Sequence, residues 1–378
     1  MINKNIIALG FVSFFTDMAS SMVTSILPLF IVYTLHEGVD KLGYVVAIAT
    51  FISYAFRILF GYLSDRFHIV KPFVVMGYLI SALTKPLLYM SSSWQSTGTL
   101  RGVERVGKAV RSATKDSLIS AYSNGKSGKT FGFHKTMDIA GELLGSLIVF
   151  GLLFYLGESE VLFRNIFLAT LIPGIIAVII VVIFVNDAPY KVKQSHFDVK
   201  QDYHILPLLF IYFGFIFFMF NDSFFLIQAK EVGIATEYIP LLVVLLNLTQ
   251  TVLSYFLGIK IDEIGAKKIL TLSFVFGLLS TVSLYYHLIV MGFIFLGIFM
   301  VGSLNALRAY ISNHAHNKGT VYGILYGGVA LFGAVGALNT GLIWKYFDAQ
   351  GAILFSLIGM SVIFLFFLVV NNSNYKSD

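Results

Sequence analysis

The sequence contains no cysteine among its 378 residues, so disulfide bonds, thiolate catalysis and cysteine-ligated metals are excluded. Charged residues are also scarce: they make up 12% of the chain, against about 25% in soluble proteins. Neither a Walker A loop nor an H-E-x-x-H motif occurs, so we expect neither direct ATP hydrolysis nor that type of metalloenzyme. The hydrophobic share of 57% and the mean hydropathy of +0.83 instead predict an integral membrane protein.

Apolar segments long enough to cross a bilayer recur along the whole chain. A spanning helix needs about 20 apolar residues, and cuts at polar residues, Gly and Pro leave twelve such segments. Their approximate limits are 6–35, 41–64, 72–92, 95–122, 131–157, 164–186, 205–228, 237–258, 269–287, 289–314, 319–346 and 349–370. The first run is too long for the apolar part of a signal peptide, so we expect it to be retained as a span. The sequence thus predicts an all-α membrane protein with twelve transmembrane helices.

The longest polar stretch, NDAPYKVKQSHFDVKQDYH, separates these spans into two sets of six. It predicts an N-terminal six-helix bundle over 1–186, a cytoplasmic linker over 187–204 and a C-terminal six-helix bundle over 205–378. With the N-terminus inside, thirteen Lys and Arg fall in inner segments and four fall in outer loops, namely Lys41, Arg164, Lys230 and Lys345. Because basic residues collect on the cytoplasmic side, we expect both termini in the cytoplasm and the protein in the cytoplasmic (inner) membrane.

The two sets of spans repeat one another at a fixed distance in the sequence. The loop GYLSDRFHIVK (61–71) lies between spans two and three, and GIKIDEIGAKK (258–268) lies between spans eight and nine. Four residues recur 197 positions later, in the pairs Gly61 and Gly258, Asp65 and Asp262, Lys71 and Lys268, and Arg111 and Arg308. Such pseudo-symmetry is expected of a transporter whose two halves rock around a central site.

The first of these loops resembles the signature G-x-L-a-D-R-x-G-R-[RK] of the major facilitator superfamily. The matching residues are Gly61, Leu63, Asp65 and Arg66. His68 replaces the later Gly, and the basic pair is reduced to Lys71. The segments RGVERVGKAVRSATKDSLI and FGFHKTMDIAGELLGSLI further resemble a bacterial subgroup of mostly uncharacterised or presumed efflux proteins. The resemblance implies two six-helix bundles, a central cavity lined by spans 1, 4, 7 and 10, and alternating access.

The resemblance also implies roles for individual residues. A gating relay at the cytoplasmic mouth maps onto Asp65, Arg66, Lys115 and Asp116, with Asp262 as the counterpart in the second half. Span five resembles in part the family's antiporter motif with G-P-x-x-G: Gly141 and Gly145 are present, and Ser146 stands where Pro is usual. This partial match implies export by antiport. Close packing of helices through small residues is the alternative interpretation of the two glycines.

Span four carries a row of charges on one face. At 100° per residue, its charged side chains fall within an arc of about 120°, at Arg101, Glu104, Arg105, Lys108, Arg111 and Lys115. A cation in the middle of a bilayer costs about 2.5–3.5 kcal/mol, so this face must meet protein or a water-filled cavity rather than lipid. Across all spans nine basic residues stand against six acidic ones, which leaves three positive charges without an internal partner.

A surplus of buried positive charge favours an anionic ligand, because Arg binds carboxylate or phosphate in bidentate fashion. We therefore expect a substrate site made of Arg101, Arg105, Lys108, Arg111, Asn221, Asn305 and Arg308. Two alternatives stay open. The basic groups form a buried ion-pair network with Asp138 and Glu142, or Arg101 and Arg105 pair with Glu104 and Asp222. An Arg105–Asp222 pair would act as an outer gate.

Four buried acids are candidates for carrying protons, namely Asp17, Asp138, Glu142 and Asp222. A carboxyl that moves between apolar and basic surroundings picks up and releases a proton. Asp17 is the first choice because span one would face the cavity and offers it no cation one helical turn away. A hydrogen bond between helices is its alternative role. His134 is expected in a solvated loop, and His314 and His316 at the membrane interface rather than on a metal.

These features favour a secondary transporter that moves a small organic or amphiphilic anion by alternating access, with proton-coupled efflux. A multidrug/proton antiporter for lipophilic or cationic compounds is the first alternative, although the excess of Arg and Lys would repel a cation. A non-transporting membrane sensor or lipid-handling protein is the alternative of another class. No paired nucleophile and base indicates an enzyme. We expect a monomer in the lipid bilayer with no cofactor, metal or nucleic-acid partner.

Overall fold

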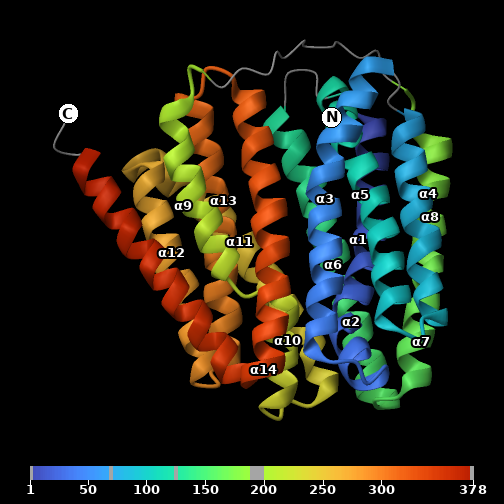
Figure 1. The fold of residues 1–378 in the computed structure, drawn as a ribbon. Helices are drawn as coiled ribbons and strands as arrows, with labels where there is room; N and C mark the ends of the chain where they lie inside the picture. The colour runs from blue at the N-terminus through green and yellow to red at the C-terminus, as the bar shows by residue number, and fades with distance from the viewer. Residues whose placement is uncertain (1–2, 68–70, 123–126, 188–199, 375–378) are drawn as a thin grey trace. The chain divides into compact units, whose positions relative to one another are not determined.

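A computed structural model describes residues 3–67, 71–122, 127–187 and 200–374, and these residues are almost entirely helical (Figure 1). The first elements are α1 (Lys4–Thr24), α2 (Leu27–Leu29), η1 (Phe30–Thr34), α3 (Val39–Phe67), α4 (Lys71–Leu87), η2 (Leu88–Met90), α5 (Trp94–Tyr122), α6 (Ser127–Leu156), α7 (Glu160–Ala169) and α8 (Leu171–Phe184). The later elements are η3 (Tyr203–Ile205), α9 (Leu206–Phe218), α10 (Asp222–Glu231), η4 (Thr236–Tyr238), α11 (Ile239–Ile264), α12 (Ala266–Tyr285), α13 (Ile289–His314) and α14 (Lys318–Asn374). No strand occurs in these described ranges. The predicted all-α membrane fold class is confirmed.

The number of membrane spans depends on two of these helices. Among the described residues, 10 helical stretches are long and apolar enough to cross a membrane. Helix α5 is not one of them because of its charges, although its 29 residues would span a bilayer. The stretch Lys318–Val370 counts as one, but Phe347 and Asp348 inside it have non-helical backbone angles, so two helices are joined there. If α5 is counted as a span and Lys318–Val370 is counted as two, the structure can be interpreted as having twelve spans.

Three of the predicted spans are broken rather than continuous. Span one passes from α1 through Ser25 into α2, which begins next to Pro28 and leads into the π-helix η1. Span six is divided between α7 and α8 at Thr170, three residues before Pro173. Span seven is divided between α9 and α10 by residues 219–221. Proline cannot donate a backbone hydrogen bond, which accounts for the first two breaks.

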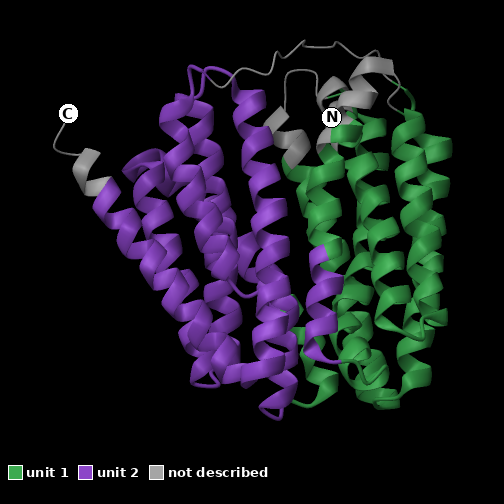
Figure 2. Ribbon diagram, in the orientation of Figure 1, with its two compact units in different colours: residues 1–37, 48–193, 234–244 green, residues 38–47, 194–233, 245–378 purple. Residues whose placement is uncertain are grey.

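The chain forms two compact units, which are coloured separately in Figure 2. Unit 1 contains residues 1–37, 48–193 and 234–244, and unit 2 contains residues 38–47, 194–233 and 245–378. The short segment 38–47, from the N-terminal half of the chain, thus belongs to unit 2. The segment 234–244, from the C-terminal half, belongs to unit 1. Their last residues lie 197 positions apart, which is the offset of the sequence repeat. Most of the predicted linker lies outside the described residues, so the domain boundaries stay predictions.

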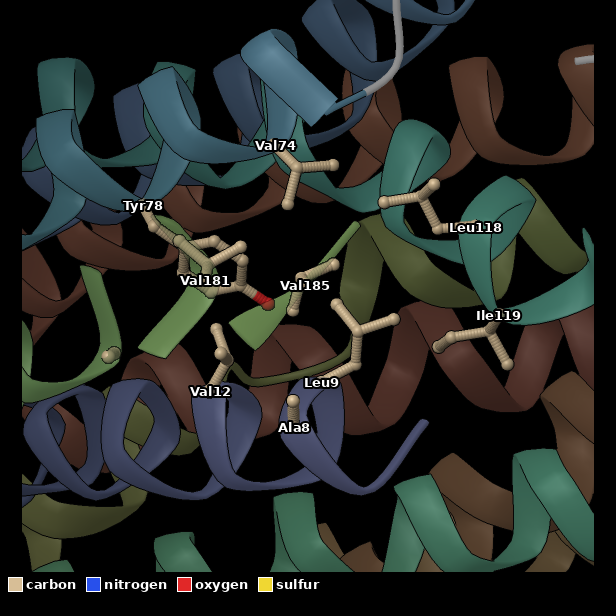
Figure 3. Packing of buried hydrophobic residues seen from close by; sticks show 10 residues of the cluster. Ala8, Leu9, Val12, Val74, Tyr78, Leu118, Ile119, Val181 and Val185 are labelled. Atoms are coloured by element: carbon tan, nitrogen blue, oxygen red, sulfur yellow. The ribbon is translucent and has the colours of Figure 1, made fainter. Parts of the chain in front are cut away.

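The apolar core of unit 1 lies where α1, α4, α5 and α8 meet (Figure 3). Leu9 and Val12 of α1, Tyr78 of α4, Ile119 of α5 and Val181 of α8 are buried there. Lipid tails are as apolar as these side chains, so the contacts stabilise the bundle through van der Waals packing rather than through transfer from water. This core fixes α4 against α5, which carries the row of charges.

Helix α1 also packs closely against α6. A Cβ atom at Gly141 would overlap the carbonyl oxygen of Phe14, and Gly145 lies equally close to the backbone of α1. Near these glycines, Ser21 Oγ and Ser146 Oγ are 2.6 Å apart. The packing interpretation of Gly141 and Gly145 is therefore confirmed. The small residues let the polar side chains of α1 and α6 lie side by side.

Candidate functional site

The charged row of α5 differs in exposure along its length. Arg101, Glu104 and Arg111 are buried, with exposed fractions of 3%, 1% and 5%. Arg105 is half-buried, and Lys108, three residues further along the helix, is exposed. The row is therefore a buried set of charges with an exposed ammonium in its middle.

Glu104 is the carboxylate that compensates the first part of this row. Its Oε2 atom accepts a hydrogen bond from Arg101 Nη1 at 3.0 Å and lies 3.3 Å from Arg105 Nε. Its Oε1 atom accepts a hydrogen bond from Ser81 Oγ of α4 at 3.3 Å. The pairing with Glu104 that the sequence left open is therefore present. One negative charge serves two guanidinium groups, so this part of α5 keeps a net positive charge.

Arg111 lies against an aromatic ring instead of an acid. Its guanidinium carbon is 4.7 Å from the centre of the Tyr78 ring on α4, and its Nη1 atom makes no hydrogen bond with a described residue. Neither Arg111 nor Lys108 has a carboxylate within 4 Å among the described residues. A cation–π contact compensates a buried guanidinium only in part, since it contributes about 2 kcal/mol when desolvated. Arg111 and Lys108 are thus the basic groups of the row that lack an acidic partner among the residues that the structure describes.

Lys85 of α4 adds a further cation beneath this row. Its side chain is 1% exposed, and Nζ donates a hydrogen bond to the carbonyl oxygen of Thr16 in α1 at 3.4 Å. It lies within electrostatic range of Asp17 and Glu104. The sequence identified Lys85 as a cation within a span but not as part of this cluster. The sequence feature that could have indicated this role is the position of Lys85 on an otherwise apolar helix.

Two acids face the cluster from the contact between α1 and α6. Asp17 of α1 and Glu142 of α6 are half-buried, and neither makes a hydrogen bond or an ion pair with a described residue. They lie within electrostatic range of one another and of Lys108. Lys108 and Arg111 are both more than 4 Å from Asp138 and Glu142. Among the described residues Lys108 and Arg111 therefore make no direct ion pair with these two acids, and Asp138 contacts a histidine.

That histidine is His134, and the prediction of a solvated loop position for it is wrong. His134 lies within α6 and is 4% exposed. Its Nε2 atom is 2.8 Å from Ser13 Oγ of α1, and its Nδ1 atom is 3.4 Å from Asp138 Oδ1. Lys115 Nζ of α5 donates a hydrogen bond to the same Ser13 hydroxyl at 3.2 Å. The four-residue spacing of His134 and Asp138 was the sequence signal for this contact.

The candidate residues of unit 2 lie at the start of α10 and on α13. Asn221 and Asp222 each accept a hydrogen bond from the backbone amide of Ser223 at 3.0 Å, at the start of α10. Asn305 donates to Ser254 Oγ at 3.3 Å. Arg308 is exposed and donates to Tyr326 Oη at 3.0 Å. These side chains do not form one cluster within the described part of unit 2, in contrast to the charged residues of unit 1.

The predicted gating residues are placed only in part. The side chains of Asp65, Arg66 and Asp116 lie outside the described part of the chain. Asp262 is exposed near the end of α11. Arg105 and Asp222 belong to different units, so the predicted outer gate stays a prediction.

A model of the family described as the Major Facilitator Superfamily matches residues 9–337 and 208–377 of this sequence. The chain belongs to the major facilitator superfamily. Its sequence is 31% identical over 385 residues to an uncharacterised MFS-type transporter, MJ1317, of Methanocaldococcus jannaschii, with 96% of this chain and 95% of that protein covered. A shorter match, 34% identical over 122 residues, joins 31% of the chain to 30% of an uncharacterised protein of Mycobacterium tuberculosis.

Solved structures of the superfamily share the fold. A mutant form of the nucleoside transporter NupG superposes with a TM-score of 0.81 at 14% identity, covering 97% of this chain and 99% of that one. A peptide-bound POT family transporter gives 0.79 at 10% identity, with 98% and 96% covered. A D-xylose–proton symporter gives 0.71 at 14% identity, with 96% of each chain covered. At such identities the likeness establishes the architecture alone and does not indicate the substrate of this chain.

Proposed function

We propose that this MFS-type transporter carries a small organic or amphiphilic anion across the cytoplasmic membrane by alternating access, as a proton-coupled exporter. The observation that carries this proposal is the pair Lys108 and Arg111, two cations on one face of α5 with no carboxylate within 4 Å among the described residues. Lys108 is exposed and can meet a ligand directly, whereas Arg111 is 5% exposed and adds positive charge behind it. An anion would supply the missing negative charge.

Arg105 completes the proposed contact surface. It shares the Glu104 carboxylate with Arg101, so its guanidinium keeps donors for a second anionic partner. Arg101 is 3% exposed and serves to hold Glu104 in place. Asn221, Asn305 and Arg308 remain the proposed contributions from unit 2.

Proton coupling is proposed for Asp17 and Glu142, with Asp138 and Asp222 as further carriers. Asp17 and Glu142 lie within electrostatic range of one another and of Lys108. A bound anion next to Lys108 would weaken the attraction of that ammonium for both carboxylates, which favours their protonation. The anion and the ionised carboxylates therefore compete for the same positive charge, which links anion binding to proton binding. The resemblance of the α6 glycine segment to the antiporter motif supports export as the direction.

The proposal is tested by transport into proteoliposomes. Small mono- and dicarboxylates, organic phosphates and lipophilic cationic dyes are offered with and without a pH gradient. Lys108→Gln should lower anion transport by about tenfold or more, because it removes a cation without leaving a carboxylate unpaired. The matched control Lys260→Gln also removes one positive charge, from an exposed side chain of α11 that pairs with Glu263. It should transport as the native chain does.

Two results would contradict the proposal. Transport of the cationic dyes with no movement of any anion would favour the multidrug alternative. Equal anion transport by Lys108→Gln and the native chain would show that this cation does not contact the substrate.

A further inference from the structure

His134 of α6 contacts α1 through one ring nitrogen and its own helix through the other. The ring is buried, and it contacts Ser13 of α1 through Nε2 and Asp138 of α6 through Nδ1. Ser13 in turn accepts a hydrogen bond from Lys115 of α5. The four side chains therefore form a continuous chain from an ammonium, through a hydroxyl and an imidazole, to a carboxylate. Nothing in the transport cycle proposed above uses its two central residues.

One tautomer of His134 gives a proton path from the ammonium to the carboxylate. A lysine ammonium can only donate, so Ser13 Oγ receives the Lys115 hydrogen bond on a lone pair. In this tautomer the hydroxyl hydrogen of Ser13 is directed at His134 Nε2, 2.8 Å away, which accepts it. A neutral ring that accepts at Nε2 carries its hydrogen on Nδ1. That hydrogen faces Asp138 Oδ1, which lies 3.4 Å from Nδ1 and makes no hydrogen bond with a described residue.

Charged groups from each neighbouring helix surround this chain. Lys115 faces His134 from α5, Asp17 from α1, and Lys135 from α6 together with Asp138. At the other end, Asp138 lies within electrostatic range of Glu142, which in turn interacts with Asp17. The chain of hydrogen-bonding groups thus ends beside the two acids to which proton coupling is assigned.

We propose that Lys115, Ser13, His134 and Asp138 form a proton shuttle that loads and unloads the carboxylate of Asp138. In the forward step an N–H bond of Lys115 breaks and an O–H bond forms on Ser13. The original hydrogen of Ser13 moves to His134 Nε2, and the Nδ1 proton moves to Asp138 Oδ1. Lys115 becomes a neutral amine, Asp138 becomes a carboxylic acid, and Ser13 and His134 stay neutral. The ring ends in the opposite tautomer, and the reverse step restores the first one.

The membrane interior favours such an exchange. Two opposite charges held apart by a serine and a histidine keep their desolvation cost but gain little direct attraction. Moving one proton through the shuttle replaces the separated charges by two neutral groups. The step also changes the charge felt by Glu142 and Asp17, which links it to the coupling acids. The shuttle rests on the proton coupling proposed above, and its test is chosen to be independent of any substrate.

The first test reads the tautomer of His134 in the full-length native chain. The protein is labelled with 15N in its histidine rings, and the signal of His134 is assigned as the one lost in His134→Gln. The expected result near neutral pH is a neutral ring with its hydrogen on Nδ1. A ring that carries its hydrogen on Nε2 would overturn the proposal, because that nitrogen could not then accept from Ser13.

The second test follows the protonation of Asp138 by infrared spectroscopy after a drop in pH, in lipid and without substrate. The carboxylic acid band of Asp138 is the one that Asp138→Asn removes. Ser13→Ala should slow its appearance by about a hundredfold, which is the usual contribution of a positioned proton relay. Ser13→Thr keeps a hydroxyl and should restore the native rate. Ser20→Ala, which removes another serine hydroxyl from α1, is the matched control and should leave the rate unchanged.

A native rate in a folded Ser13→Ala variant would overturn the shuttle. Because the infrared experiment needs no substrate, its failure is separable from failure of the transport assay. If Lys108→Gln transports normally while Ser13 controls the Asp138 signal, the substrate assignment is wrong and the shuttle stands. If a pH gradient drives transport while Ser13 has no effect, the proton takes another route and the transport proposal stands.

Discussion

At the scale of single residues, the arrangement of charges in unit 1 depends on Glu104. Its buried carboxylate holds the guanidinium groups of both Arg101 and Arg105. Removing one partner of a buried ion pair leaves an uncompensated charge in a medium of low dielectric constant, which is far more costly than losing an exposed pair. Glu104 is therefore expected to be required for folding of the bundle rather than for proton exchange.

Glu104→Gln should lower the stability of the protein by about 3–5 kcal/mol, because two buried cations lose their shared acid. The measurement is thermal unfolding in detergent. The control is Glu160→Gln, which breaks an exposed pair with Arg164 and should cost less than about 1 kcal/mol. Similar melting temperatures for the two variants would show that the guanidinium groups are compensated by other means.

Asp202 offers a prediction for the dependence of stability on pH. Burial alone would raise the pKa of its carboxyl, but hydrogen bonds from the backbone amides of His316 and Asn317 outweigh this and hold the pKa below its ordinary value. A depressed pKa in the folded state means that the stabilising contribution is fully present above the unfolded pKa of about 3.9. It is lost as the pH falls through the lower pKa of the folded protein.

Asp202→Asn should therefore be less stable than the native chain at pH 7, and the difference should shrink as the pH falls below about 4. Melting temperatures of both chains across this range give the result. Glu263→Gln, at an exposed acid of α11, serves as control and should show a small difference throughout. A difference between Asp202→Asn and the native chain that does not change with pH would exclude this account.

At the scale of helices, both halves of the chain rely on glycine for close contact. Gly141 of α6 lies against the carbonyl oxygen of Phe14 in α1, and Gly336 of α14 lies against that of Phe217 in α9. In lipid, such backbone contact contributes more to helix association than apolar side chains do, because those side chains gain nothing by leaving lipid. The contact of α1 with α6 also carries the two proposed coupling acids, so its spacing matters for function.

Gly141→Ala should destabilise the protein by about 1–3 kcal/mol, because the new methyl group meets backbone that cannot move aside. Gly151→Ala on the same helix meets no atom within 4 Å and should be neutral or stabilising, since Ala favours helix over Gly by about 1 kcal/mol. Thermal unfolding of the two variants gives the comparison. Equal effects would mean that α1 and α6 separate more easily than their contact indicates.

At the scale of the whole molecule, the repeat of 197 residues is reflected in the division of the chain. Shifted by 197 positions, the segment 38–47 falls within the segment 234–244, and each belongs to the unit of the other half. Within unit 2, Asp40 pairs with Lys345 at 3.2 Å, and Gly43 lies against Gly341. Within unit 1, Thr236 donates a hydrogen bond to Glu158 at 2.6 Å. Each of these segments therefore makes polar contacts within the unit of the other half of the chain.

The absence of cysteine makes the predicted orientation directly testable. Tyr286 and Lys268 are exposed, and they lie at opposite ends of α12. With the termini in the cytoplasm, Tyr286→Cys should react with a membrane-impermeant maleimide added to intact cells. Lys268→Cys should react only after the cells are permeabilised. The reverse pattern would invert the topology that the positions of Lys and Arg predict.

The sequence by itself determined the helical membrane fold, the internal repeat and the common face of the charges on α5. These follow from composition, length and the 3.6-residue period, which act within one helix. Only the tertiary structure decided the partners of those charges. Glu104 compensates Arg101 and Arg105, and His134 is buried against Ser13. Pairing depends on the depth and rotation of neighbouring helices, and those are set by contacts between distant segments, such as that of Gly141 with Phe14.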